Sequence, residues 1–324
     1  MNLRANPSAG QGLDVGAALG RELGGCVEPQ VGARAATGLR LAKCCSTALL
    51  ALACQCGMLA AAELCPSQGS SRGKVASINE RLELTLEGGL QLKIAGVDPP
   101  RPTPGDPDLD VRARDRLAQW LTGQEIVFRP LESGLDRWGR LPAFVFAPVA
   151  DPANGPEKAS LPVGEAILDA GLARYEPSAA ARPCRASLLA AEATARAAGL
   201  GLWADPYYAV IAAADRPSIA EKTGTAVIVE GRITGIANRR PRIMLYFGPR
   251  QSWDFSVANF PRNSKAFEAD YATLAALKGR MVRVRGLLDT RFGPQIEISN
   301  PDDIEVIGQE QDAPAAPAVL PAPR

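Results

Sequence analysis

The chain contains no histidine. This absence excludes a Ser-His-Asp or Cys-His nucleophile system, an imidazole metal site and general-base catalysis by histidine. Neither sign of charge is in excess, because 36 Lys and Arg residues face 35 Asp and Glu residues. A protein that binds nucleic acid over its whole surface needs a basic excess, so any polyanion site must be a local patch. Any chemistry must therefore use carboxylates, Lys, Tyr or Ser.

Cysteine is scarce beyond the N-terminal region. Five of the seven cysteines precede residue 63, which leaves only Cys65 and Cys184 in the rest of the chain. An even pair in an oxidising compartment is a disulfide candidate, so we predict a bridge between these two residues. The alternative is two unrelated thiols. Neither metal-ligand spacing nor a CxxC pair occurs after residue 63.

The stretch at 40–62 has the layout of a secretory signal peptide. Arg40 and Lys43 precede an apolar run at 44–62, which ends in a Leu-Ala-Ala-Ala sequence that suits cleavage. We therefore expect an exported protein, periplasmic or secreted. Because the run has about the length of a transmembrane helix, the alternative is a membrane anchor retained at 44–62.

The two ends of the chain have biased compositions. Residues 1–39 are rich in Gly and Ala without sustained periodicity, and we interpret them as disordered or as the product of a start codon placed too early. Residues 309–324 are rich in Pro and Ala, and we expect them to be disordered.

Between these ends the pattern predicts two β-rich domains, at 63–206 and 224–308, joined by a linker at 207–223. Alternating apolar residues and turn residues predict the strands, and helical spacing predicts the helices. Helices are expected at 110–121, 163–170, 187–198 and 264–277, and strands at 73–86, 90–97, 126–130, 141–147, 225–236, 243–247, 252–259, 281–288 and 295–299. The alternation of Leu82, Leu84 and Leu86 places Glu83 on the solvent face.

Three motifs follow one another in the first domain. Residues 92–101 read LKIAGVDPPR, residues 136–140 read DRWGR, and residues 192–203 read EATARAAGLGLW on an expected late helix. Each motif alone is weak evidence. Their order and spacing together resemble the thermonuclease (staphylococcal-nuclease-like) family over 73–206.

The resemblance implies a mainly β fold with helices. The first domain would be a staphylococcal-nuclease-like barrel of the oligonucleotide/oligosaccharide-binding (OB) type, with helices packed on one end. The strand and helix order of 224–308 indicates a second, small OB-like barrel. In the family, carboxylates hold calcium and an attacking water, and two arginines stabilise the transition state.

Carried over by position, the resemblance makes Asp98 the remaining metal-binding acid. Lys93 and Arg140 would be the phosphate-binding cations of the catalytic set. Arginines replace the other two acidic residues of the family. Arg81 stands where the family has a metal-binding acid in its first turn, and Arg101 stands where it has the general-base Glu. A calcium site needs six to eight oxygens with several carboxylates among them, and the two arginines repel a cation. No cofactor is therefore expected, and calcium is implied only if the family activity persists.

An arginine cluster marks the second domain. Arg239, Arg240 and Arg242 lie in an expected turn beside a strand that carries Tyr246, and residues 216–262 hold eight basic and three acidic side chains. Basic residues with an aromatic on an OB face bind single strands, so we predict a nucleic-acid site at these four residues. The alternatives are a solvated hairpin tip and a protein-docking surface.

The next strand has a different pattern. Trp253, Phe255 and Val257 alternate onto one face, which predicts that all three belong to the core.

The sequence favours an exported thermonuclease-family protein with a degenerate nuclease site. It would bind single-stranded nucleic acid or an envelope protein, with no small-molecule cofactor. The competing hypothesis is an active divalent-metal phosphodiesterase acting on DNA or RNA, with Asp98 and Glu80 as metal ligands and Lys93 and Arg140 as phosphate clamps. A third is a structural envelope protein without a ligand. The fold by itself does not decide among them.

Overall fold

The computed structural model describes residues 65–66, 69–149, 159–239, 241–250, 252–263 and 274–308. The expectations for residues 1–62 and 309–324, most of the helix at 264–277, and Arg240 lie outside these residues. Within this part of the chain, no helix is long and apolar enough to span a bilayer.

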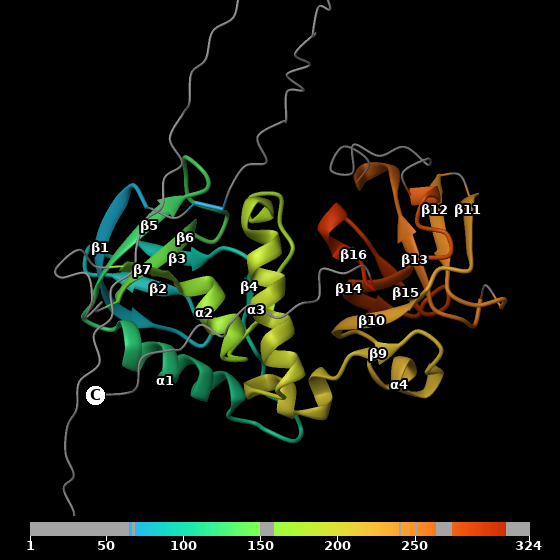
Figure 1. Ribbon diagram of the computed structural model, residues 1–324, viewed down its shortest axis with the longest axis horizontal. Helices are drawn as coiled ribbons and strands as arrows, with labels where there is room; N and C mark the ends of the chain where they lie inside the picture. The colour runs from blue at the N-terminus through green and yellow to red at the C-terminus, as the bar shows by residue number, and fades with distance from the viewer. Residues whose placement is uncertain are drawn as a thin grey trace, which may run out of the picture. The chain divides into compact units, whose positions relative to one another are not determined.

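The first sheet closes into a barrel. Its strand order is β3-β2-β1-β5-β6-β7, and a parallel pairing between β3 and β6 joins five strands into a ring (Figure 1). The six strands are β1 (Ser71–Ile78), β2 (Leu84–Leu86), β3 (Gln91–Ile94), β5 (Glu125–Pro130), β6 (Arg140–Val149) and β7 (Ala159–Pro162). The expected mainly β OB barrel is confirmed.

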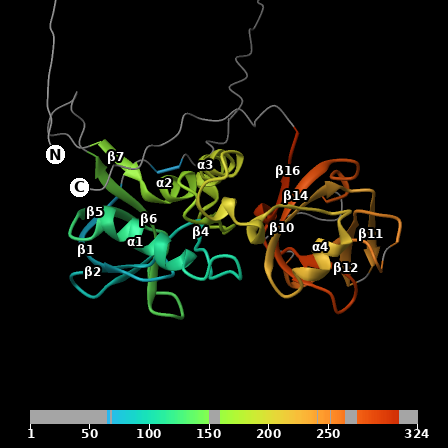
Figure 2. The same cartoon turned by 90° about the horizontal axis from the view of Figure 1, so that it is seen from below.

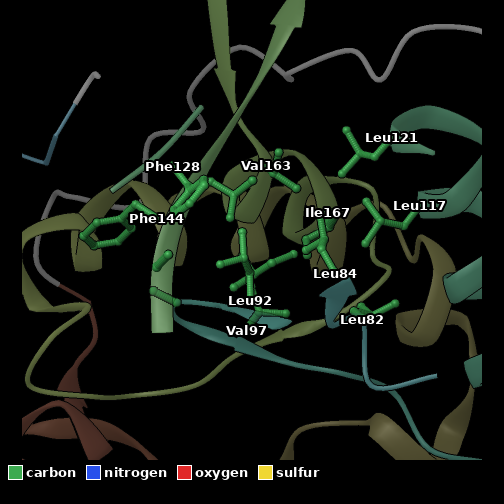
Figure 3. Packing of buried hydrophobic residues seen from close by; sticks show 14 of the residues in the cluster. Leu82, Leu84, Leu92, Val97, Leu117, Leu121, Phe128, Phe144, Val163 and Ile167 are labelled. Atoms are coloured by element: carbon green, nitrogen blue, oxygen red, sulfur yellow. The ribbon is translucent and has the colours of Figure 1, made fainter. Parts of the chain in front are cut away.

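Three helices accompany this barrel: α1 (Leu109–Leu121), α2 (Val163–Asp169) and α3 (Arg185–Ala197). The buried residues of α1 recur at every fourth position, which gives the helix one apolar stripe. Figures 1 and 2 show that this helix covers one end of the barrel. In Figure 3, Leu117 and Leu121 of α1 lie beside Leu84 and Ile167 in the packed core.

The C-terminal region forms a further sheet with its own core. The strand order is β11-β12-β13-β15-β14-β10-β9, with β16 paired to β14 and with β13 parallel to β15. These strands are β9 (Ile211–Ala212), β10 (Ala226–Arg232), β11 (Gly235–Arg239), β12 (Arg242–Tyr246), β13 (Ser256–Asn259), β14 (Met281–Asp289), β15 (Gln295–Glu297) and β16 (Ile304–Val306). A cluster of buried residues separate from that of the first barrel fills this sheet.

The stretch at 207–223 is part of this second core rather than a linker. It contains β9 and α4 (Arg216–Glu221), which Asp215 caps by accepting a hydrogen bond from the backbone of Ser218. Ile211 and Ile219 are buried in the C-terminal core. The expectation of a linker was wrong because the two apolar side chains that anchor the segment are too far apart to form a periodic pattern.

A buried ion pair connects α3 with the C-terminal sheet. The Glu192 carboxylate accepts from both terminal nitrogens of Arg285 on β14, at 2.8 and 2.5 Å, and from the backbone N–H of Tyr175. The side chains of Glu192 and Arg285 are 0% and 7% exposed. Burial opposes ionisation of Glu192, but the charge and hydrogen bonds of Arg285 hold its pKa below the ordinary value. Such a pair is costly to break by removing one partner, since an uncompensated charge then stays buried.

The predicted disulfide between Cys65 and Cys184 is present in the structure, with Cα atoms 4.5 Å apart. Cys184 ends a short 3-10 turn just before α3, and Cys65 packs against the barrel core. The bridge therefore ties the start of the described chain to the helix that carries Glu192.

Replacing both cysteines by serine should lower the free energy of unfolding. The bridge links residues 119 positions apart, and removing a native disulfide typically costs about 2–5 kcal/mol. Urea unfolding of the oxidised wild-type protein and of the double variant measures the difference. Reduced wild-type protein should match the variant. Equal midpoints for oxidised wild type and variant, or two free thiols by mass spectrometry, would contradict the prediction.

Candidate active-site cleft

A cleft of about 570 Å³ opens beside the barrel where the motifs converge. It brings together the three residues predicted to form the catalytic set, Lys93, Asp98 and Arg140. Its other charged lining residues are Glu80, Arg81, Glu83, Arg101, Asp110 and Glu176. Barrel closure explains the convergence, because β3 carries Lys93 and runs parallel to β6, which begins at Arg140.

Asp98 is positioned by a short strand pair. It lies on β4 (Val97–Asp98), which is antiparallel to β8 (Arg174–Tyr175), and its direct partner across the pair is Arg174. The guanidinium Nη2 of Arg174 lies 2.7 Å from the Asp98 Oδ2. The side chains are 11% exposed for Arg174 and 24% exposed for Asp98. The metal-binding acid predicted from the sequence is thus already neutralised by a protein cation.

Arg140 is held by two carboxylates. Its Nη1 lies 2.5 Å from Glu83 Oε1, and its Nη2 lies 2.7 Å from Asp136 Oδ2. Asp136 also accepts from the backbone N–H groups of Trp138 and Arg140, which closes the turn of the DRWGR motif. Arg140 is therefore oriented by protein acceptors and has few donors left for a ligand.

The expectation that Glu83 faces solvent was wrong, since Glu83 is 7% exposed. Leu82 has a positive φ of 54° and belongs to the turn, and β2 begins only at Leu84. The alternation therefore does not extend back to Leu82. The turn directs Glu83 inward to Arg140, and the Asn79 amide donates to the Glu83 carboxylate at 2.8 Å.

Two further acids of the cleft, Glu176 and Glu80, also form ion pairs. Lys93 Nζ lies 2.7 Å from Glu176, the residue that follows β8. Glu80 pairs with Arg114 of α1, and hydrogen bonds from its own backbone and from Arg114 lower its pKa. Glu80 would have to leave Arg114 before both of its oxygens could bind a metal.

Arg81 and Arg101 are the exception. Both are exposed, both line the cleft, and within the described residues neither guanidinium has an ion-pair partner. The backbone of Arg101 is fixed, because its N–H donates to the Tyr208 hydroxyl at 2.7 Å. These two arginines stand at the positions where the resemblance expects carboxylates, and they leave two unpaired positive charges on the wall.

This donor set does not fit a calcium ion. Among the described residues, no group of three or more acidic, Cys or His side chains converges to hold a metal. The Asp98 carboxylate accepts from a guanidinium, one oxygen each of Glu80 and Glu83 pairs with an arginine, and the second oxygen of Glu83 accepts from Asn79. A divalent cation would have to displace these partners and approach Arg81 and Arg101 against their charge.

Residues 91–205 match the family model of the staphylococcal nuclease homologues. The segment is a nuclease-family domain. The match includes Lys93, Asp98, Arg101 and Arg140 and begins after the turn that carries Arg81. The part of the chain described here from 69 to 208 is called the nuclease-like domain below. A search of the curated proteins found no match.

The predicted nucleic-acid site of the C-terminal sheet is only partly assembled. Arg239 is exposed and Arg242 is half-buried at the β11–β12 turn, with the Arg242 guanidinium carbon 5.9 Å from the Phe260 ring centre. Tyr246 is 8% exposed and packs with Met244, Ala258 and Phe260 in a small cluster. Its ring is therefore covered and offers no face for stacking a base.

Sequence patterns missed several residues of interest. The partners Arg174 and Glu176 lie more than 75 positions from the residues that they neutralise, and only the β4–β8 register could have revealed them. Trp253 was expected in the core but is 72% exposed, because β13 starts at Ser256 and the tryptophan lies in the preceding turn. Trp138 of the DRWGR motif is 57% exposed, with the Arg137 guanidinium 3.9 Å from its ring centre.

Asp136 should give the molecule an acid-sensitive component of stability. Burial opposes its ionisation, but hydrogen bonds from Arg140 and from two backbone N–H groups lower its pKa from 3.8 to about 2. A lowered folded-state pKa adds stability above pH 3.8 that is lost as pH falls through about 2. Asp136→Asn should destabilise the protein at neutral pH by about 1.5–3 kcal/mol.

Urea unfolding midpoints of wild type and Asp136→Asn at neutral pH and near pH 2 test this prediction. The difference between the two proteins should shrink at the acidic pH. A constant difference at both pH values would mean that the Asp136 charge contributes nothing.

Proposed function

We propose that this chain is an exported, non-catalytic member of the nuclease family that binds single-stranded nucleic acid. One observation carries the loss of catalysis: each charged residue of the predicted catalytic set, including the Lys93 that replaces a family arginine, is bound to an opposite charge of the protein itself. Asp98 is bound to Arg174, Lys93 to Glu176, and Arg140 to Glu83 and Asp136.

The missing chemistry follows from these pairs. Phosphodiester cleavage in the family requires a metal, a base and free cations that develop contacts in the transition state. Here arginines stand at two of the family's carboxylate positions: Arg81 replaces a metal-binding acid and Arg101 replaces the general base. The cations Lys93 and Arg140 already form ion pairs with carboxylates of the protein. A cleft of this kind can still hold an anion, because two guanidinium groups on its wall, those of Arg81 and Arg101, have no ion-pair partner in the described part of the chain.

The C-terminal sheet supports a second OB-like barrel. Strands β12-β13-β15-β14-β10 follow the order of the first barrel, β2-β3-β6-β5-β1, and both contain one parallel pair, β13–β15 or β3–β6. In this proposal β10 and β11 act as one bent strand that closes the ring. OB barrels bind oligonucleotides and oligosaccharides on comparable faces, which is consistent with a nucleic-acid ligand.

Export is supported by two features. Residues 40–62 have the layout of a signal peptide, and the Cys65–Cys184 disulfide is a bond that persists in oxidising compartments. In a periplasmic or secreted location, the protein would meet free nucleic acid outside the cytoplasm and not the chromosome. No cofactor is needed for binding, and calcium is needed only if the family activity persists.

We expect the protein to cleave DNA and RNA no faster than its Asp98→Ala variant. Loss of general-base catalysis alone removes about 10²–10⁴-fold in rate, before the loss of the metal is counted. Digestion of plasmid, single-stranded DNA and RNA with calcium, magnesium or manganese provides the measurement. Metal-dependent cleavage that the Asp98 change abolishes would restore the hypothesis of an active phosphodiesterase using Asp98 and Glu80.

Binding of a short single-stranded oligonucleotide should weaken steeply as salt rises, because phosphate contacts release counterions. Arg81→Glu/Arg101→Glu should abolish binding at the cleft. The matched variant Arg239→Glu/Arg242→Glu tests the hairpin of the C-terminal sheet. Fluorescence anisotropy at several salt concentrations measures both. No binding at low salt would reject the nucleic-acid ligand and leave an envelope protein partner or a structural role.

A further inference from the structure

Arg174 is held by more than Asp98. One terminal nitrogen donates to the Asp98 carboxylate at 2.7 Å, and the other donates to the carbonyl oxygen of Ala226 on β10 at 3.1 Å. The guanidinium carbon also lies 5.1 Å from the ring centre of Tyr208, over its face. An acid, a carbonyl and an aromatic face are three partners that favour a cation at one fixed place.

These partners come from different parts of the chain. Arg174 and Asp98 are register partners in the β4–β8 pair, Tyr208 follows the last helix of the nuclease-like domain, and Ala226 begins the first long strand of the C-terminal sheet. Tyr208 is also the residue whose hydroxyl binds the backbone of Arg101. The arrangement is thus part of the fold and does not depend on a flexible surface side chain, since the Arg174 side chain is 11% exposed.

We propose that Arg174 is a built-in replacement for the family's metal ion. Its guanidinium supplies the positive charge at Asp98, and the C-terminal sheet keeps it there through Ala226. The inference deepens the proposed function, because it names what takes the place of the metal in the same cleft. Arg174 lines the adjoining cavity, which shares Asp98, Arg101 and Glu176 with the cleft. A phosphate group at this junction would meet Arg174 and Arg101 where the family places a metal ion.

The charge of Arg174 opposes binding of a metal ion at Asp98. A divalent cation at Asp98 would lie close to the Arg174 charge, and the two like charges would repel each other in water and more strongly as burial increases. Restoring the acids at Arg81 and Arg101 would therefore not restore a metal site by itself. Arg174 has to lose its charge as well.

The test compares two sets of restored acids. Arg81→Asp/Arg101→Glu is expected to show no measurable calcium binding by calorimetry or by terbium luminescence. Adding Arg174→Gln, which keeps a donor for Ala226 but removes the charge, should give calcium affinity on the order of tenfold tighter or more. Arg174→Ala in the same background provides a second version of the change.

The matched control is Arg182→Ala in the same background. Arg182 also reaches the C-terminal region, where it donates to Asp302 at 3.0 Å and to Asn300 at 3.1 Å, but it does not touch Asp98. This control should leave calcium affinity as weak as in the double variant. Thermal unfolding of every variant confirms that each one folds.

Three outcomes would overturn the proposal. They are calcium binding by the double variant as tight as with Arg174→Gln, equal gains from Arg182→Ala, and no gain from either Arg174 change in folded protein. A separate arm measures oligonucleotide binding by the wild type, which should be equal in calcium and in chelator. Absence of any oligonucleotide binding would refute the proposed function and leave the calcium result, and with it the role of Arg174, standing.

Discussion

The parallel pairing of β3 with β6 is the constraint on which the cleft depends. It closes five strands into a ring and fixes the register in which Gln91 faces Arg140 and Lys93 faces Pro142. Without this closure the residues of the first motif and those of the DRWGR motif would lie on separate edges of an open sheet. The core beneath, seen in Figure 3, gives the register its stability, since a shift by one residue would turn Leu92 and Ile94 out of it.

Charged side chains that are buried beside the barrel need opposite charges, and here other side chains of the same protein supply them. Arg140 with Glu83 and Asp136 shows the principle most clearly, because all three side chains are mostly buried and point at one another. The same principle that stabilises the fold removes functional groups from chemistry. A carboxylate that pairs with an arginine has fewer lone pairs left for a metal and lies beside a charge that repels one, and an arginine paired in this way has fewer donors left for a phosphate. Stability and catalytic readiness are alternatives at these positions.

Some features could be predicted from the sequence because each of them leaves a pattern in it. The stripe of α1, the convergence of Lys93, Asp98 and Arg140 and the pairing of the two cysteines follow from periodicity, family spacing and cysteine counting. The partners Arg174 and Glu176 could not be predicted, because their positions depend on a two-residue strand pair with no pattern of its own. Tyr246 shows a different limit: its direction relative to Leu245 was predicted correctly, but the Phe260 side chain that covers it is set by tertiary packing.

The buried pair of Glu192 and Arg285 bears on what counts as a domain in this protein. Glu192 lies inside the segment that matches the nuclease family, yet its counter-charge lies eighty residues beyond the end of that segment. An excised family segment would lose the Arg285 partner of Glu192, leaving Arg196 at 3.6 Å as the cation beside that carboxylate, and would lose the Ala226 carbonyl that holds Arg174. The unit whose buried charges are compensated is therefore longer than the segment that sequence comparison delimits, because the C-terminal sheet supplies partners to both Glu192 and Arg174.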